Sequence, residues 1–398
     1  MKNVFTLKNT DILEKLFSKE CDGISEVVIA PKELARLGSI ELKEVNALAS
    51  KLKQHGKRVF LQWDILMTEG SFDLAVEQLK EIDWNYIDAI RVQDAGAYHY
   101  ALENLETEIH LILEQGNHNL TGIHYWIEYA QKYQSKKLKR LVLSMEIPYE
   151  RFTQFIKEIH AKKIEVEIMA LGQILLFYSP RSLVKPLFED ITSDELNNDE
   201  ISVIGNSEES PHKGFPITEN IHGTFMFNTK DHCIVEYFEK LKLIELDAWR
   251  FDLSNDQAHT LITDISLATT EEAFQGIKEA YPEKVIQGFF KTNKSDVLFK
   301  KLKNKRISRK EVGFLGEVVD VKKKEHIGIH LKNPKVSFKN GQSLTFFTPE
   351  GKEKTTTVVQ AWQANQKNIS EASMGQVIFI PHLGGISTKT MVYDSSLL

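Results

Sequence analysis

Charged and polar side chains occur in this sequence where predicted β-strands end, and such positions can gather at one site. Arg250 and Asp252 alternate in the strand pattern AWRFDL, so both point to the same side of that strand. The pair could clamp an anionic substrate, or it could form a structural ion pair. In VEIMALGQILLFYSPRS a strand pattern breaks at Gly172 and is followed by Tyr178 and Arg181. Their hydroxyl and guanidinium groups could orient an anionic or carbonyl group by hydrogen bonds.

Carboxylate and amide side chains follow several other predicted strands. Carboxylates that converge on one place could bind a metal ion or act as general acid and base. Asp and Asn at these positions also commonly cap the helix that follows, so each residue alone has a structural explanation. The candidates at strand ends are Asp64, Asp94, Glu114 or Gln115, Glu146 and Asn228.

A cysteine lies in the segment NTKDHCIVEYF. Asn228 or Thr229 could cap a helix there, which would place Cys233 in the first turns, where the helix dipole favours a thiolate. A nucleophile would need a neighbouring base, and the adjacent His232 would point elsewhere on a helix. From these residues alone we expect Cys233 to be buried and unreactive.

Short β-branched runs alternate with longer amphipathic patterns up to about residue 285. This alternation predicts an α/β fold of the TIM type, a parallel (β/α)8 barrel whose chemistry gathers at the C-terminal ends of the strands. An open doubly wound sheet is the competing topology, but no glycine-rich phosphate-binding turn follows the first predicted strand. The predicted strands are 25–30, 58–64, 88–94, 109–115, 140–145, 164–170, 223–228 and 248–253.

The pattern divides the chain into parts. We expect a barrel domain at 1–285 that contains an unusually long connection at 182–222, which is typical of a lid, a partner loop or a disordered segment. A basic linker is expected at 286–310. Short strands separated by turns such as NGQ and PEGKE then predict a small antiparallel β-barrel domain at 311–398.

Basic residues are concentrated in one region of an acidic chain. The sequence has a net charge of −6, yet residues 291–340 contain 15 Lys or Arg and only 5 Asp or Glu. Such a region could be a solvated linker, or it could be an electrostatic contact for the phosphates of RNA. The candidate nucleic-acid-binding residues are Lys300, Lys301, Lys303, Lys305, Arg306, Arg309 and Lys310.

The composition is that of a globular protein, with 398 residues, 42% hydrophobic and 27% charged. The only two cysteines, Cys21 and Cys233, fit a reducing compartment. No apolar run approaches the length of a membrane span, so we expect a cytoplasmic protein without a membrane partner.

Several segments together resemble the collagenase-like peptidases, peptidase family U32. GQILLFYSPRS resembles a family signature in which a strand with Glu is followed by glycine, cysteine and Tyr-Ser-Gly-Arg-Cys. NIHGTFMFNTKDHC is similar to a second landmark, and AWRFDL stands where the family has Lys-Ile-Glu-Gly-Arg. IQGFFKTN and NGQSLTFFTPEG resemble segments of the tRNA-hydroxylation branch. The residues that keep these patterns are Glu167, Gly172, Tyr178, Ser179, Arg181, Asn228, Lys230, Asp231 and Cys233.

The resemblance also implies a cofactor that this chain is not equipped to hold. Relatives in the hydroxylation branch use an iron–sulfur cluster bound by four cysteines. At the matching positions this chain has Leu175 and Ser182, no cysteine in the 182–222 connection, and only Cys233. A single thiolate cannot hold a cubane cluster, so we expect no iron–sulfur cofactor.

Three functions are compatible with the resemblance. The first is a cluster-less protein that acts in or with modification of tRNA or rRNA. The second is a collagenase-like peptidase, a hydrolase using the barrel-mouth residues Asp94, Glu146, Arg250 and Asp252. The third is a non-catalytic partner subunit of a cluster-bearing relative. The expected catalytic residues are Glu146, Tyr178, Arg181, Arg250 and Asp252, and the expected substrate-binding residues are Asp94, Asn228, Lys230 and Cys233.

Overall fold

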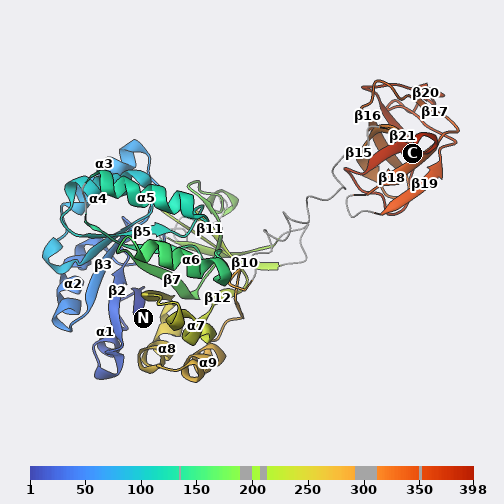
Figure 1. Cartoon of the computed structure of the whole chain (residues 1–398). Coiled ribbons are helices and arrows are strands. Elements are labelled where there is room, and N and C mark those ends of the chain that lie inside the picture. Colours follow the sequence, from blue (N-terminus) through green and yellow to red (C-terminus); the bar gives the residue numbers. More distant parts are fainter. Residues whose placement is uncertain (134–135, 189–199, 207–212, 292–311, 349–351) are drawn as a thin grey trace. The chain divides into compact units, whose positions relative to one another are not determined.

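The computed structural model of the chain (Figure 1) describes residues 1–133, 136–188, 200–206, 213–291, 312–348 and 352–398. The chain forms two compact units, Met1–Asn293 and Lys294–Leu398. The predicted linker residues Lys300, Lys301, Lys303, Lys305, Arg306, Arg309 and Lys310 lie outside the described residues.

The first unit is a closed ring of eight parallel β-strands with helices on its outside (Figure 1). Neighbours in the ring follow chain order, and a direct pairing between β7 and β13 closes it. The predicted TIM-like barrel is therefore confirmed. The ring consists of β1 (Lys2–Leu7), β2 (Ile24–Ile29), β3 (Arg58–Trp63), β4 (Ala89–Val92), β5 (Glu108–Leu113), β6 (Leu138–Leu143), β7 (Glu165–Gly172) and β13 (Ala248–Asp252).

Helices cover the barrel because each has one apolar face. In α6, for example, Phe152, Phe155, Ile156 and Ile159 recur at helical spacing and are all buried. The helices are α1 (Leu13–Leu16), α2 (Val45–Gln54), α3 (Glu69–Leu79), α4 (Ala95–Asn104), α5 (Leu120–Lys132), α6 (Tyr149–His160), α7 (Phe238–Leu243), α8 (Asn255–Leu267) and α9 (Glu271–Ala280), with short 3-10 turns η1 (Lys19–Cys21), η2 (Leu42–Glu44), η3 (Trp84–Tyr86), η4 (Lys185–Phe188) and η5 (Val235–Tyr237).

The expectation that residues 223–228 form a barrel strand is wrong. β11 (Gly223–Phe227) belongs instead to a four-stranded antiparallel sheet in the order β8-β11-β10-β9, and the ring is completed by β1. An alternating apolar run fits a parallel or an antiparallel strand equally well, so the pattern alone could not separate the two. The other strands of this sheet are β8 (Leu175–Ser179), β9 (Ile201–Asn206) and β10 (Lys213–Asn220).

Gly223 is the point where this inserted sheet turns back on itself. Its φ of 122° lies in a region that side chains disfavour. A Cβ atom there would also lie 2.1 Å from the carbonyl oxygen of Ser179. Glycine therefore allows β11 to approach β8 closely.

The expectation that Cys233 lies in the first turns of a helix is also wrong. Cys233 ends the short strand β12 (Asp231–Cys233), which pairs antiparallel with Leu171 and Gly172 of β7. β12 also pairs in parallel with β14 (Val285–Ile286). These backbone hydrogen bonds hold the segment extended, and the following turn begins only at Val235.

The inside of the barrel contains both apolar and charged residues. Val4, Val28, Phe60, Ala89 and Ala248 form a small apolar cluster that is separate from the main core under the helices. Other inward positions carry charged side chains, among them Glu26, Arg91, Arg140 and Glu167, which form the network described below.

The second unit consists of antiparallel sheets that form a half-barrel, in agreement with the predicted all-β fold. Its six-stranded sheet has the order β19-β18-β22-β15-β16-β21, and a two-stranded sheet joins β17 and β20. The strands are β15 (Phe314–Lys322), β16 (His326–Leu331), β17 (Phe338–Lys339), β18 (Ser343–Phe347), β19 (Glu353–Thr357), β20 (Glu371–Ala372), β21 (Val377–Pro381) and β22 (Met391–Asp394), followed by η6 (Ser395–Leu397).

Within the described ranges of both units, none of the helices combines the length and the apolar character that crossing a membrane requires.

Candidate barrel-mouth site

Buried ion pairs run along the inside of the barrel. The two terminal nitrogens of the Arg91 guanidinium, Nη1 and Nη2, donate to the carboxylate of Glu167 at 2.9 and 2.8 Å. Arg140 bonds to Glu26 at 2.7 and 3.0 Å and to Glu167 at 3.1 Å. All four side chains are at most 1% exposed. Buried charges of this kind are tolerated only when they are paired, so the network is fixed in place.

Glu167 is the residue that connects this network to the mouth. Burial alone would raise the pKa of Glu167, but Arg91, Arg140 and Arg250 together lower it to about 2. The Arg250 Nε lies 3.4 Å from a Glu167 oxygen. Glu167 therefore stays ionised, and its negative charge lies beside the Arg250 guanidinium.

Arg250 is the centre of a charged cluster at the C-terminal end of the strands. Its guanidinium bonds to Asp252 at 3.1 Å and to Glu114, while Lys8 pairs with Asp252 at 2.8 Å. Of the two alternatives for Arg250 and Asp252, the ion pair is present in the structure, and the strand-end residue Glu114 also takes part. Burial would raise the pKa of Asp252, but Lys8 and Arg250 lower it.

Tyr178 belongs to a second cluster, which joins the inserted sheet to the barrel. The Tyr178 hydroxyl donates to the backbone oxygen of His222 at 3.0 Å, and its ring stacks on Phe225. The Arg36 guanidinium lies 5.9 Å from the centre of the Tyr178 ring and pairs with Asp64 at 3.3 Å. Burial raises the pKa of Tyr178, so the hydroxyl remains protonated.

A glutamine links the two clusters. Gln62 accepts a hydrogen bond from Arg91 Nε at 3.0 Å and donates to Asp64 at 3.0 Å. Since Arg91 binds Glu167 and Asp64 binds Arg36, one chain of contacts leads from Arg250 to Tyr178. The structure thus brings these two predicted residues into one network at the same end of the barrel.

Two donors of this network, one nitrogen of Arg36 and Nε of Arg250, are buried and make no hydrogen bond of acceptable geometry among the described residues. Arg36 is 6% exposed and bonds to Asp64 and to Gln93 at 2.6 Å. Its Nη1 atom is buried and has no hydrogen-bond partner among the described residues. A buried guanidinium nitrogen without a partner is costly, and an anionic or carbonyl group at this position would satisfy it.

The turn after Tyr178 is held by a carboxylate. Glu219 accepts hydrogen bonds from the hydroxyls of Ser182 and Thr224 and from the backbone N–H groups of Leu183 and Val184. Burial favours its protonated form, but these donors lower the pKa of Glu219 to about 2. Arg181, directly before this turn, is exposed.

The donor set does not fit an iron–sulfur cluster. Leu175 offers no ligand, and the Ser182 hydroxyl is engaged by Glu219. Cys233 is 0% exposed and packs in the same apolar core as Leu171, and burial raises the pKa of its thiol. Within the described ranges, no three His, Cys, Asp or Glu residues come together as a metal site.

The other predicted site residues are spread around the mouth. Glu146 lies after β6 with an oxygen 3.5 Å from His118 Nε2. Asp94 caps α4 by accepting hydrogen bonds from the backbone of Gly96 and Ala97, which is the structural alternative for this residue. Asn228 is partly buried after β11, and Lys230 is exposed.

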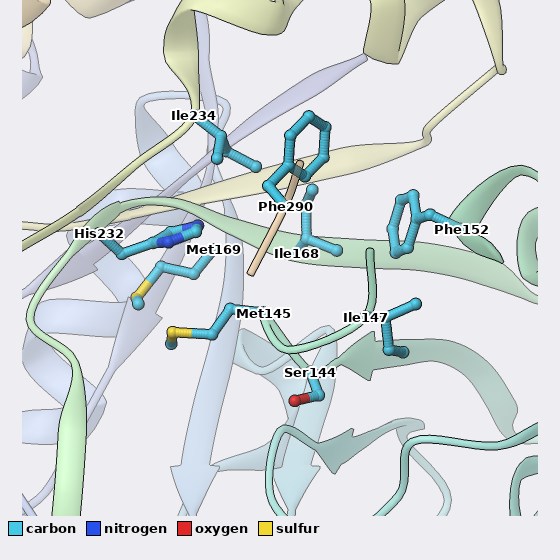
Figure 2. A pocket seen from close by; sticks show the side chains of 9 residues that line it. All are labelled: Ser144, Met145, Ile147, Phe152, Ile168, Met169, His232, Ile234 and Phe290. Atoms are coloured by element: carbon cyan, nitrogen blue, oxygen red, sulfur yellow. The ribbon is translucent and has the colours of Figure 1, made fainter. Parts of the chain in front are cut away.

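A small apolar pocket lies beside this region (Figure 2). It is lined by residues from the ends of β6 and β7, from β12 and from the segment after β14, and it has room for about one water molecule. His232, from β12, faces it and is buried. Neither ring nitrogen of His232 makes a hydrogen bond of acceptable geometry among the described residues. Burial lowers the pKa of His232 to about 4 despite the nearby backbone of Met169, so the ring is neutral.

Sequence reasoning missed Arg36, Lys8 and Gln62. Lys8 directly follows β1, a strand that the pattern did not reveal. Arg36 lies in the loop after β2, and Gln62 is an inward residue of β3, one position before the last strand residue. Recognising KNVFTL as a strand would have placed Lys8 at the mouth with the other strand ends.

Comparisons with known proteins agree with the resemblance. The family model described as Peptidase family U32 matches residues 13–295. The tRNA hydroxylation protein P2 of Bacillus subtilis (strain 168) is 23% identical over 219 residues, which cover 54% of this chain and 67% of that protein.

Solved structures of U32 peptidases are also similar. The C-terminal domain of a Geobacillus thermoleovorans putative U32 peptidase is 18% identical, with a TM-score of 0.19, covering 21% of this chain and 92% of that one. The U32 peptidase Mk0906 is 11% identical, with a TM-score of 0.35, covering 64% of this chain and 93% of that one. These scores are too low to support an inference, so the assignment rests on the family model.

Proposed function

The chain belongs to peptidase family U32, and from this membership we propose that it acts in or with the modification of RNA, with transfer RNA as the first candidate. The observation that carries the proposal is the similarity to a protein named for tRNA hydroxylation. The match covers two thirds of that protein, so most of its length has a counterpart in this chain.

The barrel mouth supports a role in binding a small anionic or carbonyl-bearing molecule. Arg36 provides a buried nitrogen that has no hydrogen-bond partner within the described part of the chain, and Tyr178 and Arg250 lie in the same network. Buried, preoriented guanidinium groups bind carboxylates and phosphates strongly.

We further propose that the chain works without an iron–sulfur cluster of its own. Leu175 and Ser182 replace two of the sulfur ligands that the family resemblance implies, and Cys233 is buried in the apolar core. The incomplete set favours a partnership in which a cluster-bearing relative supplies the redox chemistry. The two free cysteines are compatible with a cytoplasmic location, where tRNA is also found.

Nucleoside analysis of tRNA tests this function. A strain lacking the protein is complemented with the wild type, with Arg36→Gln, or with Arg58→Gln as the matched control. Arg58 lies at the opposite end of the barrel, where it pairs with Glu26 and Glu108. We expect a hydroxylated nucleoside to fall in the deletion strain and with Arg36→Gln, and to return to normal with Arg58→Gln. An identical nucleoside profile in the deletion strain and its parent would contradict the proposal.

A further inference from the structure

The inserted sheet ends in an edge strand that has no sequence feature to prevent pairing with another chain. β9 pairs with β10 in regular antiparallel register from Ile201 to Gly205, and no other strand in the described part of the chain pairs with it. Its sequence, ISVIGN, contains no charged residue and no proline. Lysine, proline and bulges are the usual features that keep edge strands from pairing. The outer edge of β9 can therefore accept a further strand.

The opposite edge of the same sheet is anchored to the barrel. Only Gln173 and Ile174 separate β8 from the barrel strand β7, and the ring of Tyr178 in β8 lies beside the guanidinium of Arg36. β9 is at the other end of the sheet order, and the side chain of its Ile204 is 66% exposed. Of the two edges, β9 is thus the one that another molecule can reach.

A proline in β10 shows which backbone groups of β9 point outward. Pro216 lies opposite Ile204 and has no N–H, so the two residues cannot exchange the two bonds of a hydrogen-bonded pair. Such pairs alternate along an antiparallel ladder, so the N–H and C=O of Ile204 point away from β10. The hydroxyls of Ser202 and Thr218 lie 3.3 Å apart, which fits the closer side chains of another non-hydrogen-bonded pair. Ser202, Ile204 and Asn206 therefore present their backbone groups at the open edge.

From this edge we propose that two copies of the chain associate through β9, which pairs antiparallel with β9 of the second copy about a two-fold axis at Ile204. Ile204 then lies opposite Ile204 of the second copy, and Ser202 lies opposite Asn206. Every outward N–H and C=O of these three residues finds a partner in this register. The two exposed isoleucine side chains also bury each other on one face of the joined sheet.

A second copy supplies what this edge requires, an open and uncharged strand with an apolar residue at the matching position. The pairing is closed, because a two-fold axis uses the same strand of both copies and leaves no further β9 edge. It does not depend on the proposed function in RNA modification. An interface made mainly of one strand from each copy is small, so we expect a weak and reversible dimer.

Sedimentation velocity of the full-length protein from about 1 μM to about 1 mM covers the range of weak association. We expect the sedimentation coefficient of the wild type to rise with concentration towards that of a dimer. Ile204→Lys should remain a monomer, because it places two ammonium groups opposite each other across the axis. Ile221→Lys is the matched control, since Ile221 is 65% exposed but lies in the turn between β10 and β11. This control should associate as the wild type does.

A cysteine at the axis tests the register. The Cα atoms of a hydrogen-bonded antiparallel pair lie about 5.5 Å apart, which a disulfide can span. Mild oxidation should therefore link Ile204→Cys into a covalent dimer and leave Ile221→Cys monomeric. The native Cys21 and Cys233 are both buried and should not compete. Circular dichroism should show that all variants are folded.

Three results would overturn the proposal. The first is a wild type that stays monomeric over the whole concentration range. The second is a dimer that Ile204→Lys does not weaken. The third is equal covalent linkage of the two cysteine variants.

Discussion

Glu167 connects the buried ion pairs inside the barrel to Arg250 at the mouth. It is fully buried and contacts three arginines, Arg91, Arg140 and Arg250. Its strongly lowered pKa means that its negative charge is retained at any physiological pH. Without this charge, Arg91, Arg140 and Arg250 would each lose a buried ion-pair partner.

We predict that Glu167→Gln lowers the free energy of unfolding by about 3–5 kcal/mol, because it leaves buried arginines incompletely paired. Glu108→Gln is the matched control, since Glu108 pairs with Arg58 and both side chains are more than a third exposed. That control should cost about 1 kcal/mol or less. Urea denaturation measures both values, and equal losses in the two variants would contradict the role given to Glu167.

His232 predicts a specific dependence of stability on pH. Its pKa is about 4 in the folded chain, against an ordinary value of 6.5. Between these values the unfolded chain binds a proton that the folded chain does not, so stability is lost as the pH falls from 6.5 towards 4 and is constant above 6.5. The full loss is on the order of 3 kcal/mol.

The test compares urea denaturation at pH 7.5 and pH 4.5 for the wild type and His232→Gln. Other titrating groups, including the buried His110, are present in both proteins, so their contributions cancel in the comparison. The variant should lose less stability on acidification than the wild type. Equal losses would show that His232 is not buried in its neutral form.

At the scale of elements, the inserted sheet and its turn are held by a few local features. Glu219 of β10 ties the turn at Ser182 to the sheet through three hydrogen bonds from Ser182, Leu183 and Val184, and it accepts a fourth from Thr224 of β11. Gly223 lets β11 turn beside β8. The segment around Ser182 resembles a cysteine-bearing segment of the family. In this chain it is held by the Glu219 carboxylate and by the close approach of β8 and β11 that Gly223 allows.

We predict that Gly223→Ala destabilises the protein more than Gly56→Ala does. Both glycines have positive φ values, 122° and 72°, so both variants suffer backbone strain of about 1–2 kcal/mol. Only Gly223 would also place a Cβ against backbone, since nothing lies within 4 Å of a Cβ at Gly56. Thermal denaturation measures the difference, and a smaller effect at Gly223 would contradict the close approach of β8 and β11.

The sequence predicted the barrel because most of its strands carry β-branched runs followed by amphipathic helices. It also predicted that Arg250 and Asp252 share a face, since side chains alternate along a strand. It could not separate β11 from a barrel strand, because alternation does not report which partner a strand pairs with. The network through Gln62 and Arg36 depends on the register between strands and on a loop, neither of which has a local sequence signal.

At the scale of the whole molecule, the chain combines a barrel with a charged mouth and a separate half-barrel of antiparallel strands. In the sequence, the seven basic residues between positions 300 and 310 lie between the last barrel strand and the first strand of the second unit. For a protein that acts on RNA, such a stretch can supply affinity that does not depend on sequence.

We predict that replacing Lys300, Lys301, Lys303 and Lys305 with Gln weakens tRNA binding and reduces the salt dependence of the affinity. The slope of log K against log salt should fall by about one for each phosphate that a lysine no longer neutralises. The matched control replaces Lys19, Lys43, Lys51 and Lys132, which are exposed on the barrel unit, and changes the net charge equally. Filter binding at several salt concentrations provides the measurement. Equal weakening in both variants would assign the effect to net charge alone.

We propose that this U32 barrel has a charged mouth but lacks the sulfur ligands to hold an iron–sulfur cluster. Iron and acid-labile sulfide in protein purified anaerobically, without a co-expressed relative, test this claim most directly. We predict no iron or sulfide above the level of the buffer. About four iron and four sulfide per chain, the content of a cubane cluster, would contradict it.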